Sequence, residues 1–140
     1  MTAVSAPGKA FLFGEYAVLD GAPALIAAVN VRAHAWTVDP DTRPGDTPCD
    51  ASPEVRSALA RAHAHLNLDP ATSPDARPAL DSRPFSPGLR KLGFGSSAAV
   101  TVSTVAWCLS CAGRDLTDPE TRAAVFELAR AAHHLSLIHI

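Results

Sequence analysis

The sequence predicts an α+β fold, with strands near the N-terminus and helices in the later part of the chain. Residues 4–38 are rich in apolar side chains and broken by glycines, which indicates a meander of two or three strands. Residues 52–66, 96–112 and 117–133 each carry the pattern of a helix. Strands in one part of a chain and helices in another are typical of the α+β class.

The strand predictions rest on apolar runs and on alternation. Residues 11–13 and 24–31 are apolar runs, and residues 31–38 alternate moderately, as in a half-exposed strand. Residues 69–87 hold five prolines and are expected to be irregular or to lie at a sheet edge, with a short strand at 79–82.

The helix predictions rest on start signals and on apolar content. A proline-rich loop at 39–52 ends at Ser52, which can cap a helix that has Pro53 in its first position. The segment 96–112 is apolar almost all round and is therefore expected to be buried on several sides. The segment 117–120 reads Thr-Asp-Pro-Glu and is expected to be a capping box.

Composition narrows the functional classes. The chain has 140 residues, 47% of them hydrophobic, and a formal net charge of -2, which fits one globular domain. The lack of a basic surplus argues against nucleic-acid or anionic-membrane partners. No apolar run is long enough to span a bilayer, and the first ten residues do not form a secretion signal. Three cysteines suit a reducing cytoplasm rather than a disulfide scaffold.

A glycine-rich turn before the second helix carries the strongest chemical signal. Gly93 and Gly95 let the backbone turn tightly and approach a ligand, and Ser96 and Ser97 open the helix. Free N–H groups and the positive end of the helix dipole then face one point, which favours phosphate binding. The plain alternative is a loop-to-helix junction with a serine cap.

Two other phosphate motifs fit this turn poorly. The Walker pattern needs a lysine directly before its Ser or Thr, and Gly95 stands there. The dinucleotide fingerprint matches loosely as Gly93-x-Gly95-x-x-Ala98, but residues 86–90 make a poor buried strand. The acid at the expected distance, Asp115, lies in a connection between helices.

A second unusual stretch lies at residues 6–19, where Lys9 follows a Pro-Gly pair and Glu15 follows Gly14. Taken alone, this stretch would indicate only an exposed ion pair on a β-hairpin. Together with the sequence Gly-Phe-Gly-Ser-Ser-Ala-Ala at 93–99, it resembles the GHMP kinase superfamily, which includes galactokinase, homoserine kinase, mevalonate kinase and phosphomevalonate kinase. The resemblance runs from about residue 4 to residue 134 and implies a mixed β-sheet with helices packed on one face.

Within the superfamily, the chain is most similar to the branch of mevalonate-pathway kinases. Galactokinases usually carry Arg-Val-Asn where this chain has residues 9–11. Mevalonate kinases usually have histidine after the Gly-Glu pair, whereas Tyr16 and Lys91 resemble phosphomevalonate kinases. The resemblance thus favours phosphomevalonate kinase, with mevalonate kinase as the alternative.

The resemblance also implies how the site works. ATP would be the phosphoryl donor, a small molecule the acceptor, and Mg²⁺ the metal. The phosphates of ATP would lie against residues of the glycine-rich turn, namely Gly93, Phe94, Gly95, Ser96, Ser97 and Ala98. Ser97 would ligate Mg²⁺, with the Ser96 hydroxyl nearby. Lys9 would stabilise charge beside the acceptor oxygen, and Glu15 and Tyr16 would line the substrate side.

Residues 1–134 are expected to be the ATP-binding domain of such a kinase, truncated, and residues 135–140 a foreign tail. Family members are longer, and their metal-binding or catalytic acid lies in a later motif. The chain alone is therefore expected to be inactive. Two alternative functions stay open. One is a non-catalytic nucleotide-binding module. The other is an RNA-binding protein with a related fold, and the net charge of -2 disfavours this second alternative.

Three features are expected to be structural. Residues 107–111 read Trp-Cys-Leu-Ser-Cys, as in thioredoxin-like proteins, but a cysteine near a helix C-terminus lacks support for a thiolate. Both cysteines are therefore expected to be buried packing residues. His63 and His65 do not share a helix face, and the pair at 133–134 is expected to lie on the surface or in packing.

Overall fold

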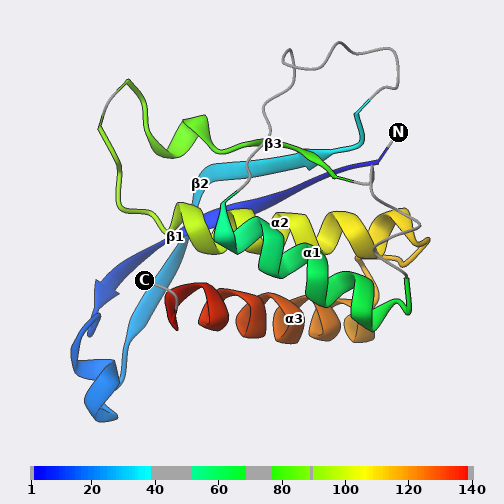
Figure 1. The fold of residues 1–140 in the computed structure, drawn as a ribbon. Coiled ribbons are helices and arrows are strands. Elements are labelled where there is room, and N and C mark those ends of the chain that lie inside the picture. The colour runs from blue at the N-terminus through cyan, green and yellow to red at the C-terminus, as the bar shows by residue number, and fades with distance from the viewer. Residues whose placement is uncertain (1, 39–51, 69–76, 89, 139–140) are drawn as a thin grey trace.

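The computed structural model describes residues 2–38, 52–68, 77–88 and 90–138. It confirms the α+β class: the described strands form one antiparallel sheet in the order β1-β2-β3, with three helices on one side (Figure 1). The elements are β1 (Ala3–Phe13), β2 (Leu25–Trp36), β3 (Ala79–Asp81), α1 (Pro53–His65), α2 (Ser96–Cys111) and α3 (Pro119–Ile138).

Two long strands form most of the sheet. β2 is continuous through both segments predicted as separate strands, and it pairs with β1 from Ala3 opposite Trp36 to Phe13 opposite Leu25. The register shifts between Pro7 and Gly8, as at a β-bulge. A Pro-Gly pair commonly marks a turn. This pair instead lies inside β1, because a bulge at an edge strand tolerates a proline that cannot donate a hydrogen bond.

The third strand is short and lies at the edge beyond β2. Asp81 stands opposite His34, which confirms the strand predicted at 79–82. Most of the loop predicted at 39–52 lies outside the described residues, as does the first part of the irregular segment predicted at 69–87.

Side chains alternate across the sheet between the helices and the exposed face. Ala6, Ala33 and Ala35 are buried on the helix side. On the other face, Arg32 Nε donates a hydrogen bond of 2.9 Å to Ser5 Oγ. Because the buried residues are alanines, the helix layer comes close to the backbone of the sheet.

The far end of the β1–β2 hairpin extends past the helices (Figure 1). A short 3₁₀ helix, Ala17–Asp20, forms its turn. Large apolar side chains are exposed along this end: Leu12, Phe13, Tyr16, Val18, Leu19, Leu25 and Ile26. Such a contiguous apolar surface is typical of a region that contacts another surface.

Helix α2 is the centre of the core, as its apolar sequence predicts. It packs on β1 and β2 on one side and on α1 and α3 on the other. Its buried hydroxyls donate to carbonyls one turn back; Thr104 Oγ1, for example, lies 2.8 Å from the Val100 oxygen. Near its C-terminus, Trp107 Nε1 donates to Thr37 Oγ1 at 3.2 Å. These polar groups are satisfied, so their burial costs little.

The two outer helices are held by caps and by small residues. Ser52 accepts a hydrogen bond from the backbone N–H of Val55, which confirms the predicted start of α1. Ser57 Oγ donates to the Ala132 carbonyl at 3.1 Å and ties α1 to α3. Four alanines are buried in these two helices: Ala58, Ala62, Ala129 and Ala132.

Both ends of α3 differ from the prediction. Its N-terminal cap is Asp118, whose carboxylate accepts from the Thr121 N–H at 2.8 Å. Thr117, the expected cap, instead donates to Asp115 through its N–H and its hydroxyl. The helix continues to Ile138 rather than ending near residue 133, because no glycine or proline follows there to stop it. Among the described residues, none of the helices combines the length and the apolar character needed to span a membrane.

The cysteines near the end of α2 differ from each other. Cys108 is buried, as predicted, whereas Cys111 is exposed, so the prediction of a buried Cys111 is wrong. Burial, with a smaller contribution from neighbouring Cys111, raises the pKa of the Cys108 thiol to about 12. This high pKa agrees with a structural role, since thiolate chemistry needs a lowered pKa.

Iodoacetamide at pH 8 should therefore modify Cys111 well before Cys108. The thiolate of Cys108 is scarce and shielded, and its alkylation should be slower by roughly 100-fold or more. Peptide-resolved mass spectrometry over a time course measures both rates. In guanidinium the two rates should converge; equal rates in the folded protein would contradict the buried placement of Cys108.

Candidate functional site

The structure brings the two sequence motifs together. The backbone N–H of Lys9 donates a hydrogen bond of 2.9 Å to the Phe94 carbonyl, so the glycine-rich turn lies along the free edge of β1. Gly8 makes this approach possible: a Cβ there would stand 2.6 Å from a ring carbon of Phe85 and 2.7 Å from the Phe94 oxygen. Any side chain at Gly8 would push the turn away from the strand.

The turn itself depends on left-handed glycines. Gly93 has φ of 74° and Gly95 has φ of 71°, where other residues are strained. A Cβ on Gly95 would lie 3.2 Å from Cγ of Lys9, whereas nothing lies within 4 Å of a Cβ on Gly93. The aliphatic stem of Lys9 therefore runs close to the backbone of Gly95.

The charged end of Lys9 lies above an aromatic ring. Its Nζ is 4.1 Å from the centroid of the Phe11 ring, within the range of a cation–π contact. Phe11 follows Lys9 by two residues on β1 and therefore projects from the same face of the strand. The aliphatic stem of Lys9 runs along the turn, and the Phe11 ring lies under its ammonium. Together they place the positive charge of Lys9 beside the turn.

The turn leads directly into the N-terminus of α2. Gly95 is the N-cap and provides no side-chain hydrogen bond, and the Ala99 N–H makes the first helical bond to the Gly95 carbonyl. The N–H groups of Ser96, Ser97 and Ala98 precede that bond, so helix geometry gives them no partner within the helix. These N–H groups point outward from the N-terminus of a buried helix, where the helix dipole stabilises an anion.

Side chains from all three helices meet at Ser97. Its Oγ lies 3.0 Å from Nε2 of His133 and 3.4 Å from Oε1 of Glu54. A hydroxyl has a single hydrogen to donate, so Ser97 donates to one of these groups at a time. Glu54 comes from the first turn of α1 and His133 from the second half of α3.

The Glu54 carboxylate is held in its ionised form. Its pKa is lowered, chiefly because it accepts a hydrogen bond from its own backbone N–H. Hydrogen bonds from Ser52 and Ser97 and the charge of His133 act in the same direction, while partial burial opposes them. No lysine or arginine pairs with it among the residues that the structure describes.

A polar cleft of about 250 Å³ opens at this place. Its walls are Ser52, Glu54, Ser82, Ser86, Lys91, Ser96, Ser97 and Val100. Four of the predicted site residues thus lie together, since Ser96 and Ser97 line the cleft while Lys9 contacts Gly95. Across the described ranges, no three His, Cys, Asp or Glu side chains cluster as a metal site, so a cation here would need ligands from water or a bound anion.

The predicted substrate-side residues lie elsewhere. Glu15 and Tyr16 are in the turn of the β1–β2 hairpin, after the end of β1. The Tyr16 side chain is 78% exposed, and neither residue lines the polar cleft.

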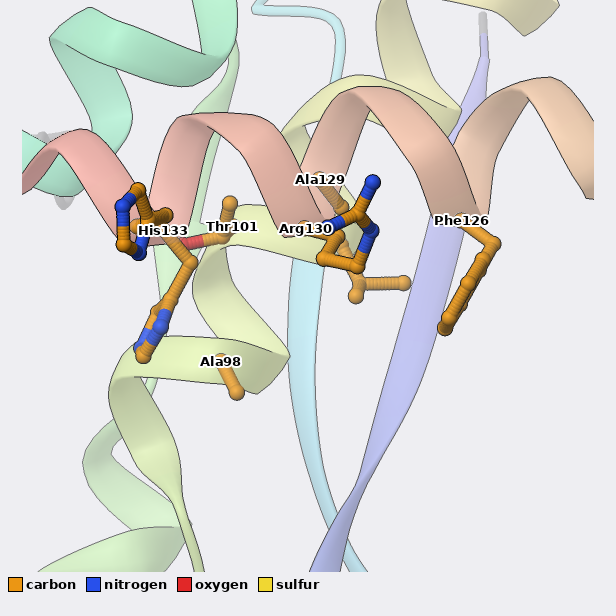
Figure 2. A pocket seen from close by; sticks show the side chains of 8 residues that line it. Ala98, Thr101, Phe126, Ala129, Arg130 and His133 are labelled. Carbon is orange, nitrogen blue, oxygen red and sulfur yellow. The ribbon is translucent and has the colours of Figure 1, made fainter. Parts of the chain in front are cut away.

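A larger, mostly apolar groove of about 360 Å³ lies between α2 and α3. Figure 2 shows Ala98 and Thr101 on α2 and Phe126, Ala129, Arg130 and His133 on α3 around it. His133 thus borders this groove and also contacts Ser97 of the polar site.

Known proteins resemble this chain in sequence, although no family model matches it. The phosphomevalonate kinase of Streptomyces sp. strain CL190 is 32% identical over 89% of this chain and 42% of its own length. The mevalonate kinase of Archaeoglobus fulgidus is 31% identical over 90% of this chain and 42% of its own length. The chain is GHMP kinase-like. It is distantly homologous to the N-terminal part of these kinases and spans about two fifths of their length.

The fold agrees with this homology. Streptococcus pneumoniae phosphomevalonate kinase, solved in complex with phosphomevalonate and AMPPNP, superposes with a TM-score of 0.68 at 24% identity. The superposition covers 94% of this chain and 42% of that chain. The superposition confirms the fold class that the resemblance implied, a sheet with helices packed on one face.

Sequence reasoning missed one residue that lies beside Ser97 and undervalued another. Glu54 follows the Ser-Pro start of α1, where an acid is ordinary because it complements the helix dipole. His133 was expected to be a surface or packing residue. Neither position has a local signal, since the proximity of both to Ser97 arises only when the three helices pack together.

The placement of Lys9 can be tested by NMR, because the chain has only two lysines, Lys9 and Lys91. The ε-protons of Lys9 should be shifted upfield from those of Lys91 by the ring current of Phe11. Phe11→Leu should remove most of the difference. Phe13→Leu, an exposed aromatic residue of the same strand, is the matched control and should leave it unchanged. Coincident ε-signals in the unaltered protein would exclude the cation–π contact.

Proposed function

We propose that this chain is the ATP-binding part of a mevalonate-pathway kinase, with phosphomevalonate as the acceptor. The observation that carries the proposal is the junction of the two motifs, in which Lys9 of β1 packs against Gly95 at the start of α2. It puts a fixed positive charge next to a helix N-terminus with unpaired N–H groups. Phosphoryl transfer depends mainly on such positioning and charge neutralisation.

The choice of acceptor is supported by the identity of particular residues. Tyr16 after the Gly-Glu pair and Lys91 before the glycine-rich turn resemble phosphomevalonate kinases. The 31% identity to a mevalonate kinase, nearly equal to the 32% to a phosphomevalonate kinase, keeps mevalonate as the second candidate.

In the proposed mechanism, the N–H groups of the turn and of the first turn of α2 bind the β- and γ-phosphates. Lys9 stabilises the negative charge that develops on the transferring phosphoryl group and the acceptor oxygen. Its stem runs close to the Gly95 backbone and its ammonium lies over the Phe11 ring, so the ammonium needs little reorganisation at the moment of transfer. Glu15 and Tyr16 would bind the acceptor from the hairpin side.

The residues of the cleft fit a magnesium ion. Mg²⁺ prefers oxygen ligands, and the Ser97 hydroxyl, the Ser96 hydroxyl and the Glu54 carboxylate supply them at one place. When bound, the ion would neutralise charge between the β- and γ-phosphates. Ser97 is the proposed protein ligand, with Ser96 as a nearby hydroxyl.

The phosphate site can be tested by substituting two glycines that both adopt the left-handed backbone conformation. Gly95→Ala should abolish ADP binding, because the new methyl group faces Lys9 and the left-handed turn is lost. Gly113→Ala is the matched control: Gly113 has φ of 79° with open space around it, at the far end of α2. Calorimetric titration with ADP should show a loss of more than tenfold only for the first variant; equal affinities would remove the turn from the site.

The activity can be tested with a chimera. The 140-residue chain alone should bind ADP without turnover, because by family resemblance an essential acid lies in a later segment. Joined to the remaining part of the Streptomyces phosphomevalonate kinase, it should release ADP with the highest kcat/KM for phosphomevalonate. A coupled assay of ADP release with phosphomevalonate, mevalonate, galactose and homoserine decides which acceptor is preferred. A preference for mevalonate would select the second candidate, and ADP binding without turnover of any acceptor would favour a non-catalytic nucleotide-binding module.

A further inference from the structure

Phe85 is a buried aromatic residue that neither of the two sequence motifs includes. It lies at the end of a short 3₁₀ helix, Arg83–Phe85, which follows β3. Among the described side chains that are fully buried, it is the largest. Protein interiors are closely packed, so a side chain of this size fixes the position of the backbone that it contacts.

The ring of Phe85 packs against the backbone of β1 at Gly8. A Cβ on Gly8 would stand 2.6 Å from Cε1 and 3.2 Å from Cζ of the ring, so the outer edge of the ring faces the glycine directly. The next residue on β1 is Lys9. The ring therefore supports the strand one residue before the lysine whose charge lies beside the glycine-rich turn.

The backbone of Phe85 contacts the second motif. Its carbonyl oxygen accepts a hydrogen bond of 3.0 Å from the N–H of Leu92, the residue directly before Gly93 and the glycine-rich turn. Its own N–H donates to the Ser82 carbonyl at 3.0 Å. Phe85 thus touches β1 with its side chain and the entry to the turn with its main chain.

The short helix that carries Phe85 is anchored to the sheet. Asp81 is the last residue of β3 and pairs with His34 of β2. The Asp81 carboxylate accepts a hydrogen bond of 3.0 Å from the backbone N–H of Arg83, and it forms an ion pair of 2.8 Å with the Arg83 guanidinium. The sheet, and not the turn, therefore determines where Phe85 lies.

We propose that Phe85 is a positioning residue that fixes the distance between Lys9 and the glycine-rich turn. Its consequence for nucleotide binding rests on the proposed function, in which Lys9 and the turn act on the same phosphates. With the ring in place, strand and turn meet at the hydrogen bond between Lys9 and Phe94. Without its outer edge, a cavity opens beneath Gly8 and the two can move apart. A misplacement of about 1 Å can cost about 100-fold where a reaction depends on positioning.

Hydrogen exchange tests this positioning on the 140-residue chain without any ligand. Phe85→Leu keeps an apolar side chain but removes the ring atoms that face Gly8. Leu109→Ala is the matched control, because it shortens another fully buried side chain, near the opposite end of α2. Circular dichroism checks that each variant is folded. The slowest-exchanging amides of α2 serve as the reference, since they report opening of the whole core.

The informative amide is that of Lys9, which bonds to the Phe94 carbonyl. In Phe85→Leu its exchange should accelerate by about tenfold relative to the reference amides, the factor expected when one hydrogen bond is lost. The amide of Leu92 should accelerate with it. In Leu109→Ala both amides should change only in proportion to the reference, because that substitution weakens the core without touching either motif.

ADP affinity tests whether the ring acts through Gly8. Calorimetry should show roughly tenfold weaker binding for Phe85→Leu, because phosphate-binding groups lose their alignment, and little change for Leu109→Ala. Gly8→Ala should also weaken binding, since its methyl group meets the Phe85 ring. In the double variant the loss should be smaller than the two single losses combined, because leucine at 85 lacks the atoms that the methyl group would meet.

The other outcomes are distinct. If the Lys9 amide of Phe85→Leu only keeps pace with the reference amides, Phe85 merely stabilises the core and the inference is overturned. Additive losses in the double variant would overturn it too, since the ring would then not act through Gly8. If Gly8→Ala does not fold, the exchange comparison decides alone. If the unaltered chain does not bind ADP, the proposed function fails, while the exchange of the Lys9 amide still decides whether Phe85 positions the turn.

Discussion

The hydrogen bond between the Lys9 N–H and the Phe94 carbonyl joins the sheet to the glycine-rich turn, and the site depends on it. β1 is an edge strand, and its free edge is covered by this turn rather than by a further described strand. The bond forms only because Gly8 has no side chain between β1, Phe85 and Phe94. One contact thus sets where the turn lies, how the stem of Lys9 runs past Gly95, and which way the N-terminus of α2 points.

The rigidity of that N-terminus comes from the burial of α2. A helix that contacts the sheet on one side and two helices on the other cannot rotate without disturbing the whole core. Alanines on the sheet and on the outer helices allow this close packing, and internal hydrogen bonds satisfy the buried hydroxyls of α2. The N–H groups at its start are therefore held in place before any ligand binds, which is the condition for strong electrostatic stabilisation.

Local chemistry predicted most of the fold, while tertiary contacts decided the rest. The start of α1 at Ser52 and Pro53, the buried α2 and the left-handed glycines follow from residues adjacent in sequence. The place of Gly8 within β1 could not be predicted from its neighbours in sequence, because it depends on pairing with β2 and on the contact with Phe94. The cap of α3 was misassigned because Asp115 competes for Thr117. The polar contacts of Ser97 could not be predicted at all, since Glu54 and His133 reach it from two other helices.

Two charged side chains of opposite sign lie near successive positions of the glycine-rich turn and the helix that follows it. Lys9 contacts the turn at Gly95, and Glu54 contacts the helix two residues later, at Ser97. A polyphosphate lying along the turn would therefore meet an ammonium at one position and a carboxylate at the next. The sign of the charge therefore changes along the turn, from Lys9 at the edge of β1 to Glu54 at the start of α1.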